Sequence, residues 1–299
     1  MGGRIRSNNR NIVENKWRRS GNCAVLQGII MRYYFDVNAI VHLMERGVEG
    51  YGLFKDTYIS KLVVDEMFKN LEKNYSRQRS QFVYIKKNKI NIDWRFCETM
   101  LFLKPFNFQF EYDLQGPKMF YDSIIKYDNY DTYIKNGKPE DEINKIVMTV
   151  IDKAREGMQN DYFERIFLYL KDLKEKFKIE KPYITKKSLL KEYLDIGIKI
   201  MADNNLLKTK IEKEICRKRG LKYYKSTKSI DYYINATIEL LKLNNEDIKR
   251  NDAADLYHLS YIDRTNNDIF VTDDRKLREI CNKAEKDSAI DLSDYLKLL

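Results

Sequence analysis

The chain has 299 residues, of which 43% are hydrophobic, and its 55 Lys and Arg exceed its 45 Asp and Glu by a net charge of +10. This composition is sufficient for a packed core in one or two domains, and no apolar run reaches the ~20 residues of a membrane-spanning helix. The four cysteines occur singly, which excludes a Cys-x-x-Cys zinc or redox motif and favours a reducing cytoplasm.

Residues 1–30 contain six of the basic residues and one acid, Glu14, and so account for half of the net charge. They show no clear periodicity, and we interpret them as a flexible or peripheral basic segment, with Met31 as an alternative natural start. A net positive charge is compatible with a nucleic-acid partner. Part of it, however, reflects a composition rich in Lys, Asn, Ile and Tyr, which is typical of AT-rich genomes.

The first regular elements form strand–helix units. Residues 32–36 read as a short aromatic strand that ends in Asp36 and is followed by a helix over about residues 38–46. Residues 57–59 predict a second strand. Ser60 is then the N-cap of a helix that carries Leu62, Val63, Glu66, Met67 and Leu71. Such repeated units indicate an open α/β sheet.

The long middle of the chain is mainly helical in pattern. Apolar residues recur at three- and four-residue spacing over residues 140–178, 186–204 and 230–243. The aromatic stretch 102–133 fits no regular pattern and is predicted to be irregular. We interpret residues 95–245 as a helical insertion or subdomain.

The C-terminal part returns to the α/β pattern. A helix over about residues 246–262 carries Asp252 and Asp255 on one face. A buried type of strand follows at residues 268–272, ends in Asp273 and Asp274, and leads to a helix over 275–284. A short strand at about 289–291 precedes the C-terminal helix.

These acids occupy positions that an open parallel sheet brings to its carboxyl edge. Carboxylates gathered there repel one another unless a cation is present, and Mg²⁺ or Mn²⁺, as one or two ions, is the cation that carboxylate oxygens and water suit best. The chain has two histidines, His42 and His258, too few for a three-histidine zinc site or an imidazole acid–base pair. We interpret His258 as a packed or surface side chain.

Four short motifs resemble those of PIN (PilT N-terminal) nucleases. Residues 34–40, Tyr-Phe-Asp-Val-Asn-Ala-Ile, resemble the opening strand and its acid, and Glu66 resembles the second motif, an acid on the helix after strand two. Residues 255–260 resemble the third acidic motif, and Val271-Thr272-Asp273-Asp274 resembles the strand that ends in Thr-x-Asp. Asp255 and Asp274 are 19 residues apart, which suits the family, whereas Glu66 and Asp255 are 189 apart.

The resemblance covers about residues 31–92 and 246–299. It implies a PIN-like three-layer α/β/α fold with a mostly parallel central sheet, formed by residues 31–94 and 246–299 and interrupted by the helical insertion. It also implies a metal-dependent endoribonuclease, in which a metal-activated water cleaves a phosphodiester. The catalytic acids and metal ligands would be Asp36, Glu66, Asp255 and Asp274, with Asp252 and Asp273 as alternative metal ligands beside the last two.

Two basic and aromatic clusters are candidates for binding nucleic acid, RNA in preference to DNA, because Lys and Arg contact phosphates and Tyr stacks on unpaired bases. The first comprises Arg217, Lys218, Arg219, Lys222, Tyr223 and Tyr224, and the second comprises Arg77, Arg79, Lys86 and Lys87.

Other interpretations of the same residues stay open. Each acid alone could be a helix cap or part of a solvated helix face. An Asp after the first strand also occurs in haloacid-dehalogenase-like phosphatases, although these have a second Asp where this chain has Asn38. A non-catalytic RNA- or protein-binding module would keep the fold without the reaction. The family resemblance also implies a toxin-like role, and a protein inhibitor or a second copy of the chain as a partner.

Overall fold

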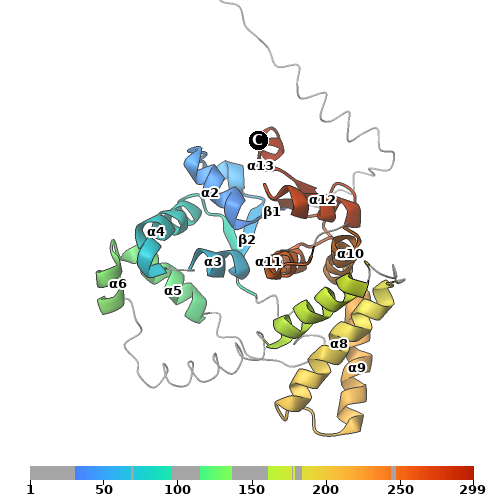
Figure 1. The fold of residues 1–299 in the computed structure, drawn as a ribbon. Coiled ribbons are helices and arrows are strands. Elements are labelled where there is room, and N and C mark those ends of the chain that lie inside the picture. Colours follow the sequence, from blue (N-terminus) through green and yellow to red (C-terminus); the bar gives the residue numbers. More distant parts are fainter. Residues whose placement is uncertain are drawn as a thin grey trace, which may run out of the picture. The chain divides into compact units, whose positions relative to one another are not determined.

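Five short parallel strands form the centre of the computed structural model, which describes residues 31–68, 71–95, 115–136, 161–176, 178, 184–243 and 247–299. Their order in the sheet is β3-β2-β1-β4-β5, and every pairing is parallel. Figure 1 shows β1 and β2 side by side. The strands are β1 (Tyr33–Phe35), β2 (Thr57–Ser60), β3 (Asn91–Asp93), β4 (Ile269–Val271) and β5 (Ala289–Ile290). The order reverses between β1 and β4, so strands from the two ends of the chain meet there. The predicted α/β class with a parallel sheet is confirmed.

Alternating side chains of β1 show that helical elements cover both faces of the sheet. Tyr34 stacks on Tyr261 of the 3-10 helix η4 (Leu256–Tyr261), with ring centroids 6.2 Å apart. Tyr33 and Phe35 point to the other face, where both contact the ring of Tyr295 in α13 (Leu292–Leu296). Successive side chains of a strand face opposite sides, so both sides of β1 are buried.

Polar caps begin the helices that follow β1, β2 and β4. Asp36, Ser60 and Asp274 each accept a hydrogen bond from the backbone N–H three residues later, which satisfies one of the N–H groups that the first helical turn leaves without a partner. These caps confirm the predicted strand–helix units. The helices are α2 (Val37–Glu45), α3 (Lys61–Met67) and α12 (Arg275–Ala284).

Two predicted helices differ from the structure. The helix predicted to extend from Ser60 to Leu71 ends at Met67, and Leu71 begins α4 (Leu71–Lys87). Met67 and Leu71 are four residues apart, which fits one helix, but α4 packs against α2 and α3 instead of continuing α3.

The helix predicted over residues 246–262 is shorter and changes its winding. It comprises α11 (Arg250–Asp255) and η4, whose six side chains are all buried. Burying six consecutive side chains does not suit one face of an α-helix, and the tighter 3-10 winding is common at helix ends. Asp255 lies at this transition.

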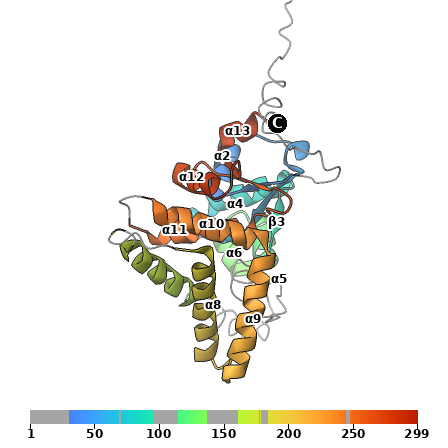
Figure 2. The same cartoon turned by 90° about the vertical axis from the view of Figure 1, so that its right-hand side faces the viewer.

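The described part of the predicted insertion is helical, in agreement with its pattern. It contains α5 (Gln115–Lys126), α6 (Tyr130–Asn136), a helix over 161–176, α8 (Lys186–Asp203), α9 (Lys210–Ser226) and α10 (Lys228–Lys242). Figure 2 shows α8 and α9 side by side. The prediction of irregular structure over residues 102–133 is wrong from residue 115 onward, because aromatic side chains of α5 and α6 pack on α4. Residues 1–30, 102–114 and 137–160 of the predicted segments lie outside the described residues.

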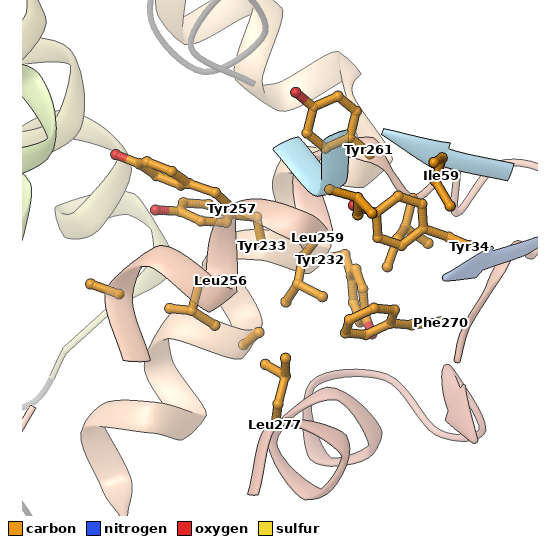
Figure 3. Close-up of a cluster of buried hydrophobic side chains, with 14 of the residues drawn as sticks. Tyr34, Ile59, Tyr232, Tyr233, Leu256, Tyr257, Leu259, Tyr261, Phe270 and Leu277 are labelled. Carbon is orange, nitrogen blue, oxygen red and sulfur yellow. The ribbon is translucent and has the colours of Figure 1, made fainter. Parts of the chain in front are cut away.

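The core joins α10 to the sheet. α10 packs against η4 and α12, and α8 packs against both α9 and α10. Figure 3 shows the buried ring of Tyr232 of α10 beside Phe270 of β4, and Tyr233 of α10 beside Tyr257 of η4. α10 therefore shares its core with the strands, although it precedes residue 246, and residues 31–299 form one compact unit.

No helix in the described ranges is both long and apolar enough to cross a membrane. Two of the four cysteines, Cys216 and Cys281, are described, and both are buried free thiols.

Candidate active site at the carboxyl edge of the sheet

Three of the predicted site acids lie just beyond neighbouring parallel strands. Asp36 follows β1, Asp274 lies three residues after β4, and Glu66 is in α3 directly after β2. Because β2, β1 and β4 are adjacent, their carboxyl ends meet at one edge, and the reversal of strand order between β1 and β4 is where such sheets open a crevice. The fourth acid, Asp255, lies at the end of α11.

Asp36 is buried and held in one orientation. Its Oδ1 accepts a hydrogen bond from Ala39 N at 2.7 Å, and its Oδ2 accepts one from Thr272 Oγ1 at 2.5 Å. Burial raises the pKa of Asp36 above its ordinary value, although both hydrogen bonds and the charge of His258 oppose the rise. The carboxylate is thus placed by contacts to its own helix and to the end of β4.

Asp255 lacks contacts from described residues that would stabilise its negative charge. It is half-buried, and no described residue donates a hydrogen bond to its carboxylate or forms an ion pair with it. Burial raises its pKa to about 6, the charges of Glu66, Asp274 and Asp252 act in the same direction, and His258 acts against them. Several carboxylates are therefore close enough to Asp255 to resist its ionisation.

Glu66 lies beside a buried histidine that the sequence did not identify as part of the site. The Oε1 of Glu66 is 3.6 Å from His258 Nε2, and His258 is only 3% exposed. Burial alone would lower the pKa of His258, but the hydrogen bond and charge of Glu66, with the charges of Asp36 and Asp255, raise it. Of the two predicted alternatives, a packed or a surface side chain, the structure shows the packed one, and the ring lies beside Glu66. Its position one turn after Asp255 was the available signal.

Asp274 is exposed and caps α12, where its Oδ1 accepts a hydrogen bond from Leu277 N at 2.8 Å. Its own backbone N donates to Thr272 Oγ1 at 3.1 Å, and the same hydroxyl donates to Asp36. Thr272 therefore connects the acid after β1 with the acid after β4, which gives a structural role to the Thr-x-Asp pattern.

The neighbouring acids Asp252 and Asp273 have other partners. Asp252 accepts hydrogen bonds from Lys276 Nζ at 3.0 Å and from Lys249 N at 2.8 Å. Asp273 is hydrogen-bonded to His42 Nδ1 at 2.7 Å and to Leu292 N at 3.1 Å. Burial would raise the pKa of Asp273, but these hydrogen bonds and the charges of His42 and Arg46 lower it. Asp252 and Asp273 are each paired with a basic side chain, Lys276 and His42, whereas Asp255 and Asp274 form no ion pair with a described residue, so Asp255 and Asp274 are the better candidate ligands.

The donor chemistry of the site suits a hard divalent cation. All four candidate donors are carboxylates, and a bound cation would stabilise the ionised form of Asp255, which burial and the neighbouring acids disfavour. In their present side-chain positions, the described residues contain no group of three or more His, Cys, Asp or Glu that could hold a metal ion. Contacts mediated by water, which Mg²⁺ often retains, do not require so close a group.

The basic cluster on α4 is largely neutralised. Arg79 forms an ion pair with Asp128 at 2.5 Å, Lys86 with Asp122 at 3.5 Å, and Lys87 with Glu49 at 2.6 Å. Arg77 is exposed and forms no ion pair with a described residue. This cluster offers phosphates less positive charge than its sequence suggests.

The basic cluster on α9 keeps more of its charge. Lys218, Arg219 and Lys222 are exposed and form no ion pair with the described part of the chain, whereas Arg217 bonds to Asp195 and Glu214. Tyr224, however, is 1% exposed and Tyr223 is half-buried. Tyr224 belongs to the core and cannot stack on a base there, so α9 presents cations without the predicted pair of rings.

Comparison with known protein families, with curated proteins and with solved structures finds no match to this chain. The functional interpretation therefore depends on the geometry of Asp36, Glu66, Asp255 and Asp274.

Proposed function

We propose that the chain is a metal-dependent nuclease with a PIN-like fold, and specifically an endoribonuclease. The observation that supports it best is that Asp36, Glu66, Asp255 and Asp274 follow or flank adjacent parallel strands at the point where the strand order reverses, and that burial and the charges of Glu66, Asp274 and Asp252 resist the ionisation of Asp255. An acidic cluster of this kind suits phosphodiester hydrolysis better than chemistry that needs a histidine pair or a thiol.

In this proposal each acid has a defined task. Asp36, fixed by Ala39 N and Thr272, provides the most rigid carboxylate. Glu66 and Asp255 would contribute carboxylates from α3 and α11, and Asp274 would contribute one from the N-cap of α12. A bound Mg²⁺ or Mn²⁺ would supply an activated water and stabilise the charge that develops on the phosphate. The four carboxylates would hold the cation and orient that water.

The proposed substrate is RNA, with Lys218, Arg219 and Lys222 of α9 as the phosphate contacts. Their charges face solvent and have no acidic partner among the described residues, so a polyanion can bind them without breaking an ion pair. Binding through these residues would be sensitive to salt and largely independent of base sequence.

Cleavage of single-stranded RNA and DNA oligonucleotides of mixed sequence tests the proposal. The wild-type chain and Asp36→Asn would each be assayed with Mn²⁺, with Mg²⁺ and with EDTA. We expect metal-dependent internal cuts in RNA by the wild type and none by the variant. A folded Asp36→Asn protein that cuts as fast as the wild type would contradict the assignment of the site.

One observation favours a second candidate, a PIN-like module that binds RNA or protein without cleaving it. Both oxygens of Asp36 accept hydrogen bonds, and the described acids do not form a ready three-ligand group. Such a module would bind RNA with an affinity that is sensitive to salt but unaffected by Mg²⁺ or by Asp36→Asn. A metal-dependent affinity that the substitution abolishes would exclude it.

A further inference from the structure

A buried series of hydrogen bonds connects three elements that lie next to the acids in sequence. Ser60 Oγ is 2.7 Å from the hydroxyl of Tyr34, which is 2.7 Å from His258 Nδ1. On the other side of the imidazole ring, Nε2 is 3.6 Å from Glu66 Oε1. These hydrogen bonds therefore link β1, the start of α3 and η4, which lie next to Asp36, Glu66 and Asp255 in sequence.

When the imidazole ring of His258 is neutral, one order of the protons along this series of hydrogen bonds satisfies every donor. Ser60 Oγ already accepts from Val63 N, and its own proton has Tyr34 as its only acceptor among the described residues. If Ser60 donates to Tyr34, then Tyr34 donates to Nδ1 of His258, and the ring proton is on Nε2, facing Glu66. The opposite order would leave the hydroxyl proton of Ser60 without an acceptor and would direct a nitrogen lone pair at a carboxylate.

The ring of His258 is also fixed by packing. It stacks on Phe270 of β4 with ring centroids 6.1 Å apart and lies 5.9 Å from the ring of Tyr34, which in turn stacks on Tyr261. Figure 3 shows Tyr34, Phe270 and Tyr261 in this arrangement. Tyr34 is fully buried and Ser60 has no exposed surface. A histidine held in this way cannot turn its Nε2 away from Glu66 without disturbing the core.

We infer that His258 is a positioning residue of the site: it presents Nε2–H to Glu66 and, through Tyr34 and Ser60, holds β1, the start of α3 and η4 in register, and with them the adjacent acids Asp36, Glu66 and Asp255. The inference deepens the proposed function and rests on it for the identity of the site. His258 needs no contact with the substrate in this role. Partners that orient ligating carboxylates change metal affinity by about 10- to 100-fold when they are removed.

Nitrogen-15 NMR of the imidazole rings tests the proton order directly, because the chain has two histidines and His42→Gln assigns the remaining signals to His258. We expect a proton on Nε2 of His258, with Nδ1 as the hydrogen-bond acceptor when the ring is neutral. Tyr34→Phe should shift the Nδ1 signal, and Glu66→Gln should shift Nε2. A neutral ring that carries its proton on Nδ1 would overturn the inference.

Two substitutions of His258 separate positioning from packing. The amide nitrogen of Gln occupies about the place of Nε2, whereas that of Asn occupies about the place of Nδ1, so His258→Gln keeps a donor toward Glu66 and His258→Asn does not. Mn²⁺ affinity can be measured by electron paramagnetic resonance of the free ion. It should fall about 10-fold or more in His258→Asn, and in His258→Gln it should stay within about threefold of the wild-type affinity. Equal losses in the two folded variants would overturn the positioning role.

The two proposals fail in different ways. A wild-type chain that binds no Mn²⁺ would contradict the proposed metal site, while the position of the ring proton would still decide the role of His258. Metal binding that both variants retain would leave the nuclease proposal intact and overturn the inference about His258.

Discussion

Asp36 both starts a helix and faces the site, and two substitutions distinguish these tasks. Asn retains an oxygen that can accept from Ala39 N and removes the charge that burial disfavours, so Asp36→Asn should leave the melting temperature in EDTA unchanged or raised. Ala removes the cap as well and should lower the free energy of unfolding by about 1 kcal/mol. Thermal denaturation of both variants measures this. A large destabilisation by Asn would show that the charge stabilises the fold.

The crowded carboxylate of Asp255 predicts a stability that depends on pH. Its pKa is raised from 3.8 to about 6, so the folded chain holds a proton that the unfolded chain has already released between these values. The free energy of unfolding therefore falls as pH rises through this window. Above the window Asp255 is ionised in both states, and the loss of stability is at its maximum. Asp255→Asn avoids the cost, and its melting temperature in EDTA should exceed that of the wild type by about 2–4 °C at pH 7.5.

At pH 4.5 the same variant should gain much less, because most of the wild-type Asp255 is then protonated in the folded state. Differential scanning fluorimetry at the two pH values makes the comparison, with Asp252→Asn as the matched control, since Asp252 is already bonded to Lys276 and Lys249 N. Equal gains at both pH values would mean that ionisation of Asp255 is not what destabilises the wild type.

Among single residues, the sequence identifies a site acid best when the hydrogen-bond partners of that acid lie nearby in the sequence. Asp36 and Asp274 could be found because each follows a strand and caps the next helix. Asp255 and Asp274 could be favoured over Asp252 and Asp273 only through the family resemblance, because the partners that distinguish them, such as Lys276 and His42, come from other elements. His258 was left out of the site for the same reason, since its contact with Tyr34 joins residues 224 positions apart and Glu66 is also distant in sequence.

Among the helices, α9 carries the proposed phosphate contacts, and these can be tested by substitution. Substituting Lys218, Arg219 and Lys222 together by Gln should weaken binding of single-stranded RNA and make the dependence of log affinity on log salt shallower by about 2, because each phosphate contact contributes about 0.7. Fluorescence anisotropy over a series of salt concentrations measures both. The fold should be unaffected, since all three side chains are exposed.

The matched control removes the same number of charges from α4, by changing Arg79, Lys86 and Lys87 to Gln. These side chains already have acidic partners, so the affinity for RNA should change less than in the α9 variant. If the α4 variant loses as much affinity or more, the proposed role of α9 is wrong.

Elements with strong local signals were predicted well, and those determined by packing were not. The boundaries of α12 could be read from its cap and apolar spacing. β3 was missed because its three residues, Asn91–Asp93, include two polar ones and resemble a turn. α9 was missed because most of its residues are charged, and Gly220 lies in its interior. There a Cβ would come within 2.3 Å of Leu194, so the glycine permits close packing of α8 and α9.

Across the whole molecule, the decisive feature is that the end of the chain returns to its beginning. β4 and β5 pair beside β1 although most of the sequence lies between them, and this pairing brings Thr272 and Asp274 to Asp36. The parallel α/β class could be predicted from the repeated strand–helix units. The strand order and the sharing of the core with α10 depend on contacts between distant residues, which local patterns do not encode.

The central claim is that acids from four separate segments form one metal centre. Anomalous X-ray scattering from crystals equilibrated with Mn²⁺ tests it most directly, because it locates the ion without reference to activity. We predict one or two peaks among Asp36, Glu66, Asp255 and Asp274, with ligation directly or through water. The absence of a peak there at saturating Mn²⁺, or a peak bound by Asp252 or Asp273 instead, would contradict the account.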